Sequence, residues 1–160
     1  MRKVVSNTTP LIALADIGQL ELLHKLYGEI MIPEAVFNEV ESELARMMVS
    51  KAEWIKKVKV HHPDRKSLFS SRLHAGEVEA IILAEEENAN LLIMDDNAAK
   101  KTAKYLGFQV TGTLGVIVKA KQNGYIENVE KYLDLLINDG LYVDVKTKEM
   151  VLKMAGEFCG

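Results

Sequence analysis

Short apolar segments alternate with longer segments of helical periodicity, and this alternation constrains the fold more than any other feature. The clearest apolar segment is NLLIMDD, residues 90–96, where four apolar residues stand in a row. Such a run is typical of a parallel strand that is covered on both faces. Strands separated by helices of ten or more residues form βαβ units. The sequence therefore predicts an α/β fold, a three-layer α/β/α sandwich with a central parallel sheet.

The remaining elements are expected to follow the same alternation. Further strands are expected at KVVSN (3–7), EIMIP (29–33), WIKKVKVHH (54–62, near a sheet edge) and FQVTG (108–112). Helices are expected at 10–28 with a break at Gly18, and at 33–48, 75–89, 97–107, 113–124 and 126–140. The segment 142–157 is expected to hold a short extended piece and a last helix. Thr9 is the expected N-cap of the first helix, with Pro10 at its first position.

Length and composition favour one cytoplasmic domain. The 160 residues are expected to form a single domain over 1–160, with its core at about 3–125 and C-terminal helices at about 126–157. No apolar run is long enough to span a membrane, and the first residues lack the apolar stretch of a secretory signal. The single cysteine, Cys159, allows no internal disulfide. A net charge of −3 argues against a plain nucleic-acid coat but leaves a carboxylate-rich nuclease open.

Polar residues follow two of the predicted strands, at the sheet edge where α/β proteins hold ligands. Asn7 follows the first strand, and Asp95 and Asp96 follow the buried strand. Two adjacent carboxylates repel each other unless a positive charge lies near, and Mg²⁺ would supply it. The alternative is that Asp96 or Asn97 simply caps the next helix.

Two glutamates on predicted helices are further candidates. Glu77 lies in the first turn of its helix, beside the buried face, where either the helix dipole or a functional partner would explain a carboxylate. Glu39 borders an apolar stripe in an acidic helix, where a solvated face is the alternative explanation. Glu43, one turn further on, competes with Glu39 for the same role.

Two weaker signals lie near the Asp pair. Lys100, Lys101 and Lys104 form the densest basic cluster and could meet a backbone phosphate, although a solvated face is the simpler interpretation. The segment GTLG, residues 112–115, could offer backbone N–H groups at a helix start, but it is too short to be specific.

Several segments together resemble PIN domains, and most closely a prokaryotic branch of PIN-like proteins. They are the polar corner after the first strand, IPEAVFNEV, AGEVEAIILA, LLIMDDNAAKKTAKYLG and VTGTLGVIVKAK, and the resemblance covers roughly residues 3–157. It implies an α/β/α sandwich and an Mg²⁺- or Mn²⁺-dependent ribonuclease acting on RNA. It also implies a role as the toxin of a toxin–antitoxin pair, with a small antitoxin as partner and a homodimer as the assembly.

The resemblance assigns a role to each candidate residue. The first acid of the family falls on Asn7, the second on Glu39, the third on Glu77 and the last on Asp96, with Asp95 beside it. These five residues would bind the metal and the four acids would be catalytic. Thr8 and Thr9 would support the site by hydrogen bonding.

Asn7 departs from the family pattern, because an amide keeps an oxygen ligand but gives up a negative charge. In one interpretation Glu39, Glu77 and the Asp pair suffice, and the protein is a slow or metal-demanding ribonuclease. In the other it is a catalytically weakened PIN domain that binds RNA or a protein without cutting. A purely structural subunit is a third hypothesis. The double Asp favours the first.

Overall fold

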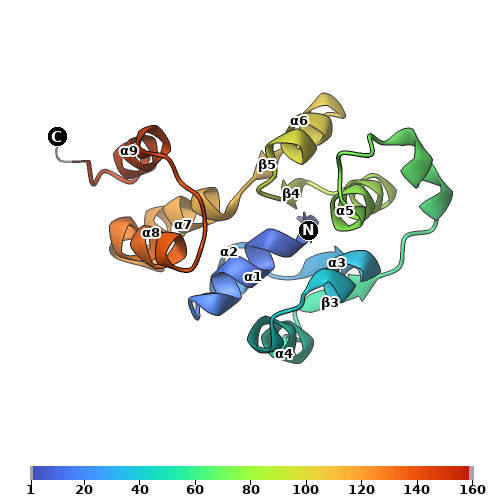
Figure 1. Cartoon of the computed structure of the whole chain (residues 1–160). Coiled ribbons are helices and arrows are strands. Elements are labelled where there is room, and N and C mark those ends of the chain that lie inside the picture. Colours follow the sequence, from blue (N-terminus) through green and yellow to red (C-terminus); the bar gives the residue numbers. More distant parts are fainter. Residues whose placement is uncertain (1, 159–160) are drawn as a thin grey trace.

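The computed structural model describes residues 2–158 of the chain, so Cys159 lies outside the described residues. Within this part, one parallel sheet has the strand order β3-β2-β1-β4-β5, with helices on both faces (Figure 1). The predicted three-layer sandwich is thereby confirmed. The strands are β1 (Val4–Ser6), β2 (Ile30–Pro33), β3 (Ile55–Val58), β4 (Leu91–Ile93) and β5 (Val110–Thr111).

The two faces of the sheet separate the apolar core into two clusters. Val4 pairs with Leu91 in the ladder and Val5 pairs with Leu92. Val4 and Leu91 pack into the larger cluster, whereas Val5 and Leu92 pack into the smaller one. This is the two-residue alternation of strand side chains. β4 is buried along its whole length, as the run of apolar residues predicted.

The helices divide between these clusters. Helices α5 (Ala75–Glu86) and α6 (Asn97–Tyr105) cover the smaller cluster. The larger cluster receives buried side chains from α1 (Thr8–Asp16), α2 (Glu21–Tyr27), α3 (Glu34–Glu39), α4 (Glu43–Lys51), α7 (Thr113–Gln122), α8 (Val129–Asn138) and α9 (Val145–Met154). Because all five strands are parallel, their carboxyl ends lie at one common edge of the sheet, where each strand is followed by a helix or a connection.

The first helix starts earlier than the sequence predicted. Asn7 is its N-cap and Thr8 its first residue, so Thr9 does not cap the helix and Pro10 occupies the third position. A proline is tolerated there because the first-turn N–H groups have no partner within the helix. The predicted break at Gly18 is present, where φ is +72° and α1 gives way to the start of α2.

The prediction of one continuous helix at 33–48 is wrong, because the segment is divided between two helices, α3 and α4. Val40 is extended, with φ −75° and ψ 98°, and ends α3. Ser42 then starts α4, since its side-chain oxygen accepts a 3.2 Å hydrogen bond from the Ala45 N–H. The apolar stripe runs on across this break, so periodicity alone could not reveal it.

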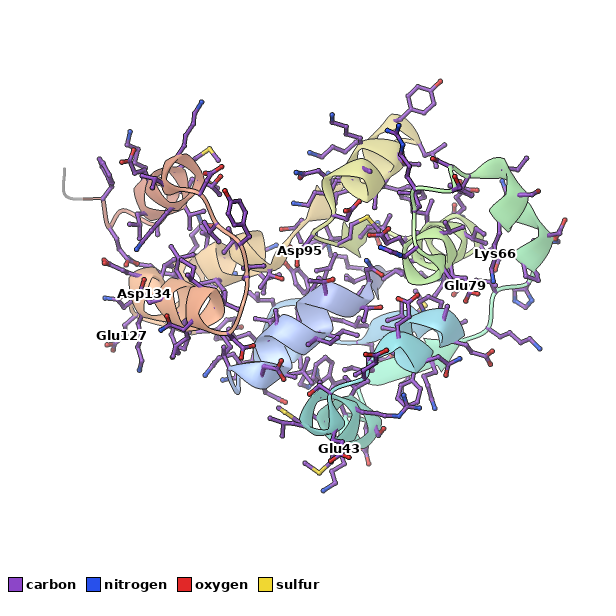
Figure 2. All side chains as sticks on the ribbon, in the orientation of Figure 1. Glu43, Lys66, Glu79, Asp95, Glu127 and Asp134 are labelled. Atoms are coloured by element: carbon purple, nitrogen blue, oxygen red, sulfur yellow. The ribbon has the colours of Figure 1, made fainter. Side chains whose placement is uncertain are left out.

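The charged connection after β3 contains a short 3₁₀ helix, η1 (Pro63–Leu68), that is fastened to α5. The Lys66 ammonium lies 2.5 Å from Oε2 of the buried Glu79, whose other oxygen accepts a 3.3 Å hydrogen bond from the Ala35 N–H. Figure 2 shows Lys66 and Glu79 approaching each other on this side of the molecule. Glu79 thus links α5 to η1 and to the start of α3.

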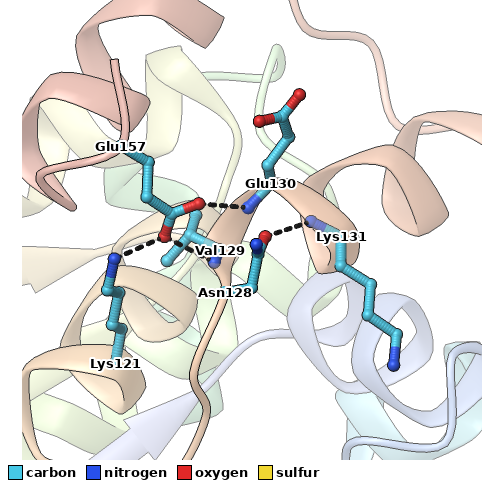
Figure 3. Close-up of polar contacts among 6 residues, drawn as sticks. All are labelled: Lys121, Asn128, Val129, Glu130, Lys131 and Glu157. Carbon is cyan, nitrogen blue, oxygen red and sulfur yellow. Dashed lines mark hydrogen bonds and ion pairs between the residues drawn. The ribbon is translucent and has the colours of Figure 1, made fainter. Parts of the chain in front are cut away.

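The C-terminal segment is fastened by Glu157. Its carboxylate accepts hydrogen bonds from the Val129 N–H at 2.7 Å and the Glu130 N–H at 3.0 Å, and pairs with the Lys121 ammonium at 2.7 Å (Figure 3). The first-turn N–H groups of α8 thereby obtain an anionic acceptor, the arrangement that a helix N-terminus favours. Glu157 consequently holds the end of the described chain against α7 and α8.

The segment between α8 and α9 is not a strand of the sheet. Residues 139–144 lie between the two helices, and of these 141–144 form a connection without regular secondary structure. Asp144 caps α9 by accepting a 2.6 Å hydrogen bond from the Thr147 N–H. Among residues 2–158, no helix has the length and apolar character needed to cross a membrane.

Candidate functional site

Asn7 occupies the end of the central strand, at the carboxyl edge of the sheet. Its N–H donates a 2.8 Å hydrogen bond to the Ile93 carbonyl, which joins it to β4. The side chain is 3% exposed, and its Oδ1 has no hydrogen-bond partner among the described residues. A buried acceptor left without a donor costs about 1–3 kcal/mol. This oxygen is therefore an available ligand that the fold itself does not use.

Glu39 is the last residue of α3, and it points toward the first turns of α1 and α5. Its Oε2 accepts a 2.9 Å hydrogen bond from the Thr8 hydroxyl, and its Oε1 accepts a 2.7 Å hydrogen bond from the Gly76 N–H. A Cβ on Gly76 would overlap the Glu39 carboxylate, so the glycine is what allows this approach. Two donors from different helices thus fix one carboxylate at the sheet edge.

The structure distinguishes Glu39 from its sequence competitor Glu43. Glu43 lies in the first turn of α4 and is exposed. Figure 2 shows it on the outer side of α4, well separated from Asp95. Of these two acids, Glu39 is therefore the one that lies at the sheet edge.

Glu77 is buried in the first turn of α5, with 5% of its surface exposed. Its Oε1 accepts a 2.9 Å hydrogen bond from the His74 N–H, which closes the start of the helix. Burial raises the pKa of the Glu77 carboxyl; the His74 N–H opposes this rise, and the charges of Asp96 and Glu39 add to it. The influence of Asp96 and Glu39 on this pKa indicates that the three carboxyl groups share one electrostatic environment.

The two adjacent aspartates point to different helices. Asp95 is half-buried and accepts hydrogen bonds from Thr113, at 2.7 Å from the N–H and 2.6 Å from the hydroxyl. Asp96 is exposed and caps α6, since its Oδ2 accepts a 3.0 Å hydrogen bond from the Ala99 N–H. The alternative that Asp96 caps the next helix is thereby confirmed, and donors at two different helix starts engage the two carboxylates separately.

The structure brings most of the predicted residues to one place and leaves two apart. The charges of Glu39 and Asp96 both act on Glu77, and Asn7 lies beside Thr8, which holds Glu39. Asp95 faces α7 instead, and Thr9 is exposed and lines a separate hollow with Asp16. Gly76 was missed, because a glycine carries no signal of which distant carboxylate its N–H meets.

The donor chemistry fits a hard divalent cation. The available atoms are carboxylate oxygens and the unpartnered Asn7 amide oxygen, which are the ligands that Mg²⁺ and Mn²⁺ prefer. Within residues 2–158, however, no three His, Cys, Asp or Glu side chains already stand in a metal-binding arrangement. The Asn7 oxygen is therefore the one observation that points to a ligand from outside the chain.

Comparison with known proteins supports the sequence resemblance. A family model described as PIN domain matches residues 3–157, nearly the whole chain. No curated protein matches the sequence. The match covers every strand of the sheet and each of Asn7, Glu39, Glu77, Asp95 and Asp96. The chain belongs to the PIN domain family.

Proposed function

We propose that this protein is a ribonuclease that depends on Mg²⁺ or Mn²⁺ and hydrolyses phosphodiester bonds in RNA. Membership of the PIN domain family supports a nuclease-type fold. The observation that carries the proposal is the buried, unpartnered Oδ1 of Asn7 at the strand edge where Glu39, Glu77 and Asp96 interact. An oxygen that the protein leaves without a donor, at an edge that carries carboxylates, is available as a ligand for a cation.

Asn7, Glu39 and Asp96 are the residues that would hold the cation, with Glu77 beside them. A divalent ion bound there supplies Lewis-acid chemistry, which offsets the charge that develops on a phosphodiester during hydrolysis. We assign Asp95 a positioning role, because both of its oxygens are committed to Thr113 and hold the start of α7 against β4.

Glu77 is the proposed proton acceptor. Its raised pKa brings the carboxyl closer to the range in which a general base works. Oε1 accepts from the His74 N–H, so Oε2 is the oxygen that remains to take a proton. Glu39 is held by Thr8 and Gly76 and thus keeps its orientation while Glu77 changes its protonation state.

The test is RNA cleavage by the full-length protein in EDTA, Mg²⁺ and Mn²⁺, beside the variants Glu39→Gln and Asp96→Asn. Asparagine is also a good N-cap, so Asp96→Asn should leave α6 intact. Glu43→Gln is the matched control, because it removes the same charge from an exposed position on α4. Cleavage that requires metal, disappears in both variants and persists in the control would support the proposal. Cleavage in EDTA, or by Asp96→Asn, would contradict it.

Cation binding provides a second measurement that is independent of activity. Titration calorimetry with Mn²⁺ should give a binding signal for the parent protein and the Glu43→Gln control. The signal should weaken strongly in Glu39→Gln and Asp96→Asn. Equal binding by all four proteins would place the cation elsewhere.

The alternative function is a catalytically weakened PIN domain that binds RNA or a protein. Asn7 favours it, because a neutral amide stands where the family pattern has its first acid. This alternative predicts RNA binding without cleavage in any metal. Cleavage that first appears in Asn7→Asp would identify the parent protein as such a module.

Our proposal extends to the biological role that the family resemblance implies. We include a toxin function, a small antitoxin that covers the site, a homodimer and a cytoplasmic location. Co-expression with neighbouring genes, followed by purification of the tagged protein, would test for the antitoxin. Sedimentation of the purified protein would test for the dimer.

A further inference from the structure

A cavity adjoins the candidate site on the side of α7. Its volume is about 300 Å³, and it lies between α6, the start of α7 and the connection 141–144 together with the first turn of α9. This is at the lower end of the range for small-molecule sites, roughly 300–1,000 Å³. Asp95 is part of the lining, so the cavity begins where the carboxylate edge of the sheet ends. Figure 2 shows Asp95 between the two halves of the molecule that border this space.

Among the described residues that line this cavity, Lys100 is the only Lys or Arg. It is half-buried on α6, and its ammonium takes part in no hydrogen bond or ion pair with the residues described, 2–158. The nearby Asp95 carboxylate is instead engaged by Thr113. A half-buried cation without a carboxylate partner is suited to an incoming anion, and Lys is a common phosphate ligand.

Gly112 keeps open the space between Asp95 and Lys100. A Cβ at this position would lie 2.6 Å from Oδ1 of Asp95 and 3.0 Å from Nζ of Lys100. Any larger residue would therefore fill the gap between the carboxylate and the ammonium. The sequence singled out GTLG for its helix start, but the feature that matters here is the bare backbone in front of Lys100.

Tyr142 supplies an aromatic surface at the same cavity. It lies in the connection between α8 and α9, lines the cavity and is 86% exposed. Leu114 and Val143 add apolar surface beside it. Tyr142 and Lys100 thus line the same cavity, and an exposed aromatic ring together with a cation is the combination on which single-stranded nucleic acids bind, with the base stacked and the backbone paired.

The two acids of the lining do not oppose this use strongly. Asp95 accepts two hydrogen bonds at the start of α7, and Asp144 accepts one at the start of α9. Both carboxylates therefore lie at helix N-termini, where the partial positive charge offsets their own. Lys100 makes no hydrogen bond or ion pair among the described residues, so its ammonium is the charged group of the lining that is left to meet an anion.

We propose that this cavity binds one nucleotide of single-stranded RNA, with its phosphate on Lys100 and its base stacked on Tyr142. The cavity would hold the nucleotide that flanks the bond at the carboxylate site. The inference rests on the proposed function for the choice of RNA as ligand, but its test does not depend on cleavage.

The test is binding of a short fluorescein-labelled single-stranded RNA to the full-length protein in EDTA, measured by fluorescence anisotropy. The variants are Tyr142→Ala, Tyr142→Phe, Lys100→Gln and Lys101→Gln. Lys101 is the matched control, because it is an exposed lysine on the same helix and does not line the cavity. Tyr142 is so exposed that its replacement should leave the fold intact.

The proposal predicts a distinct pattern among these variants. Tyr142→Ala should weaken binding roughly 5- to 100-fold, the range for loss of one stacked base, while Tyr142→Phe should bind like the parent. Lys100→Gln should weaken binding several-fold and reduce the slope of log K against log salt by about 0.7, the value for one phosphate contact. Lys101→Gln should change neither quantity.

Two results would overturn the inference. One is equal binding by Tyr142→Ala and the parent, and the other is an equal effect of Lys100→Gln and Lys101→Gln. Failure of the nuclease proposal would look different, because cleavage would be missing while the binding pattern held. Cleavage with parental product sizes and rates in all four variants, together with unchanged binding, would remove the subsite and leave the nuclease.

Discussion

The backbone N–H of Gly76 donates a 2.7 Å hydrogen bond to Oε1 of Glu39, which ties the end of α3 to the first turn of α5. The contact exists only because position 76 has no Cβ, since an added methyl group would overlap the Glu39 carboxylate. One glycine therefore decides where a carboxylate of the candidate site points.

Gly76→Ala should accordingly impair activity more than stability. Alanine favours a helix over glycine by about 1 kcal/mol, which offsets part of the cost of moving Glu39. A displacement of a catalytic group by about 1 Å can reduce the rate roughly 10²-fold. Thermal melting and RNA cleavage, measured on the same preparation, should show a nearly unchanged midpoint and a large loss of rate. Parental activity in this variant would show that the position of Glu39 does not matter for RNA cleavage.

Glu77→Gln should stabilise the metal-free protein near neutral pH. Burial, Asp96 and Glu39 raise the pKa of Glu77 in the folded state, so ionising this carboxyl opposes folding. The penalty is absent below the unfolded value of about 4.5 and develops as the pH rises through the higher folded value. Glutamine avoids it and still accepts from the His74 N–H. Each kcal/mol gained should raise the melting temperature by roughly 2–4 °C.

Melting curves of parent and Glu77→Gln across a pH series in EDTA would check this. The two midpoints should converge in acid and diverge toward neutral pH, while the variant loses RNA cleavage. A constant difference at every pH would mean that the charge of Glu77 is not responsible.

Asn7→Asp should lower the stability of the metal-free protein and raise its affinity for a cation. It places a carboxylate at a position that is 3% exposed and close to the other acids, so the metal-free protein should melt earlier. A ligand that binds only the folded state stabilises it by RT ln(1 + [L]/Kd), so the shift produced by Mn²⁺ should exceed that of the parent. Asn138→Asp, which adds the same charge at an exposed position on α8, should not enlarge the Mn²⁺ shift. Equal Mn²⁺ shifts in parent and Asn7→Asp would argue against a cation at this atom.

Glu157→Gln should destabilise the fold near neutral pH, by about 1–3 kcal/mol on the scale of hydrogen bonds to charged groups. Although burial would raise the pKa of Glu157, Lys121 and the α8 N–H groups outweigh it and lower this pKa. The stabilisation is therefore present above the unfolded value and is lost as the pH falls through the lower folded value. Glu149→Gln, an exposed change on α9, is the control. Denaturant melts at several pH values should show the Glu157→Gln deficit shrinking in acid.

The sequence predicted those features that depend on local pattern. The apolar run at Leu91–Ile93 identified the buried strand, and Gly18 marked the end of α1. The break between α3 and α4 was not predicted, because the apolar stripe continues through Val40 although the backbone there is extended. The helix start at Thr8 escaped because several polar residues in a row could each have capped it.

The candidate site was predictable in composition but not in geometry. A polar residue after a parallel strand implies the functional edge, which is why Asn7 and the two aspartates stood out. The direction of a side chain depends on donors distant in sequence; for example, hydrogen bonds from Thr113 orient the Asp95 carboxylate toward α7. That Lys100 and Tyr142 line one cavity likewise depends on how residues 141–144 lie against α6 and α7, and no periodicity in the sequence encodes it.

The position of β1 at the centre of the sheet has a consequence for biosynthesis. Its neighbours β2 and β4 are separated from it by about 25 and 85 residues of chain, and Asn7 is held in place by Ile93. During translation, β1 leaves the ribosome first, and its second neighbour β4 follows only after more than half of the protein has been translated. The carboxylate edge cannot assemble on a nascent chain before β4 and Asp96 have emerged, so a polypeptide released before that point lacks the site.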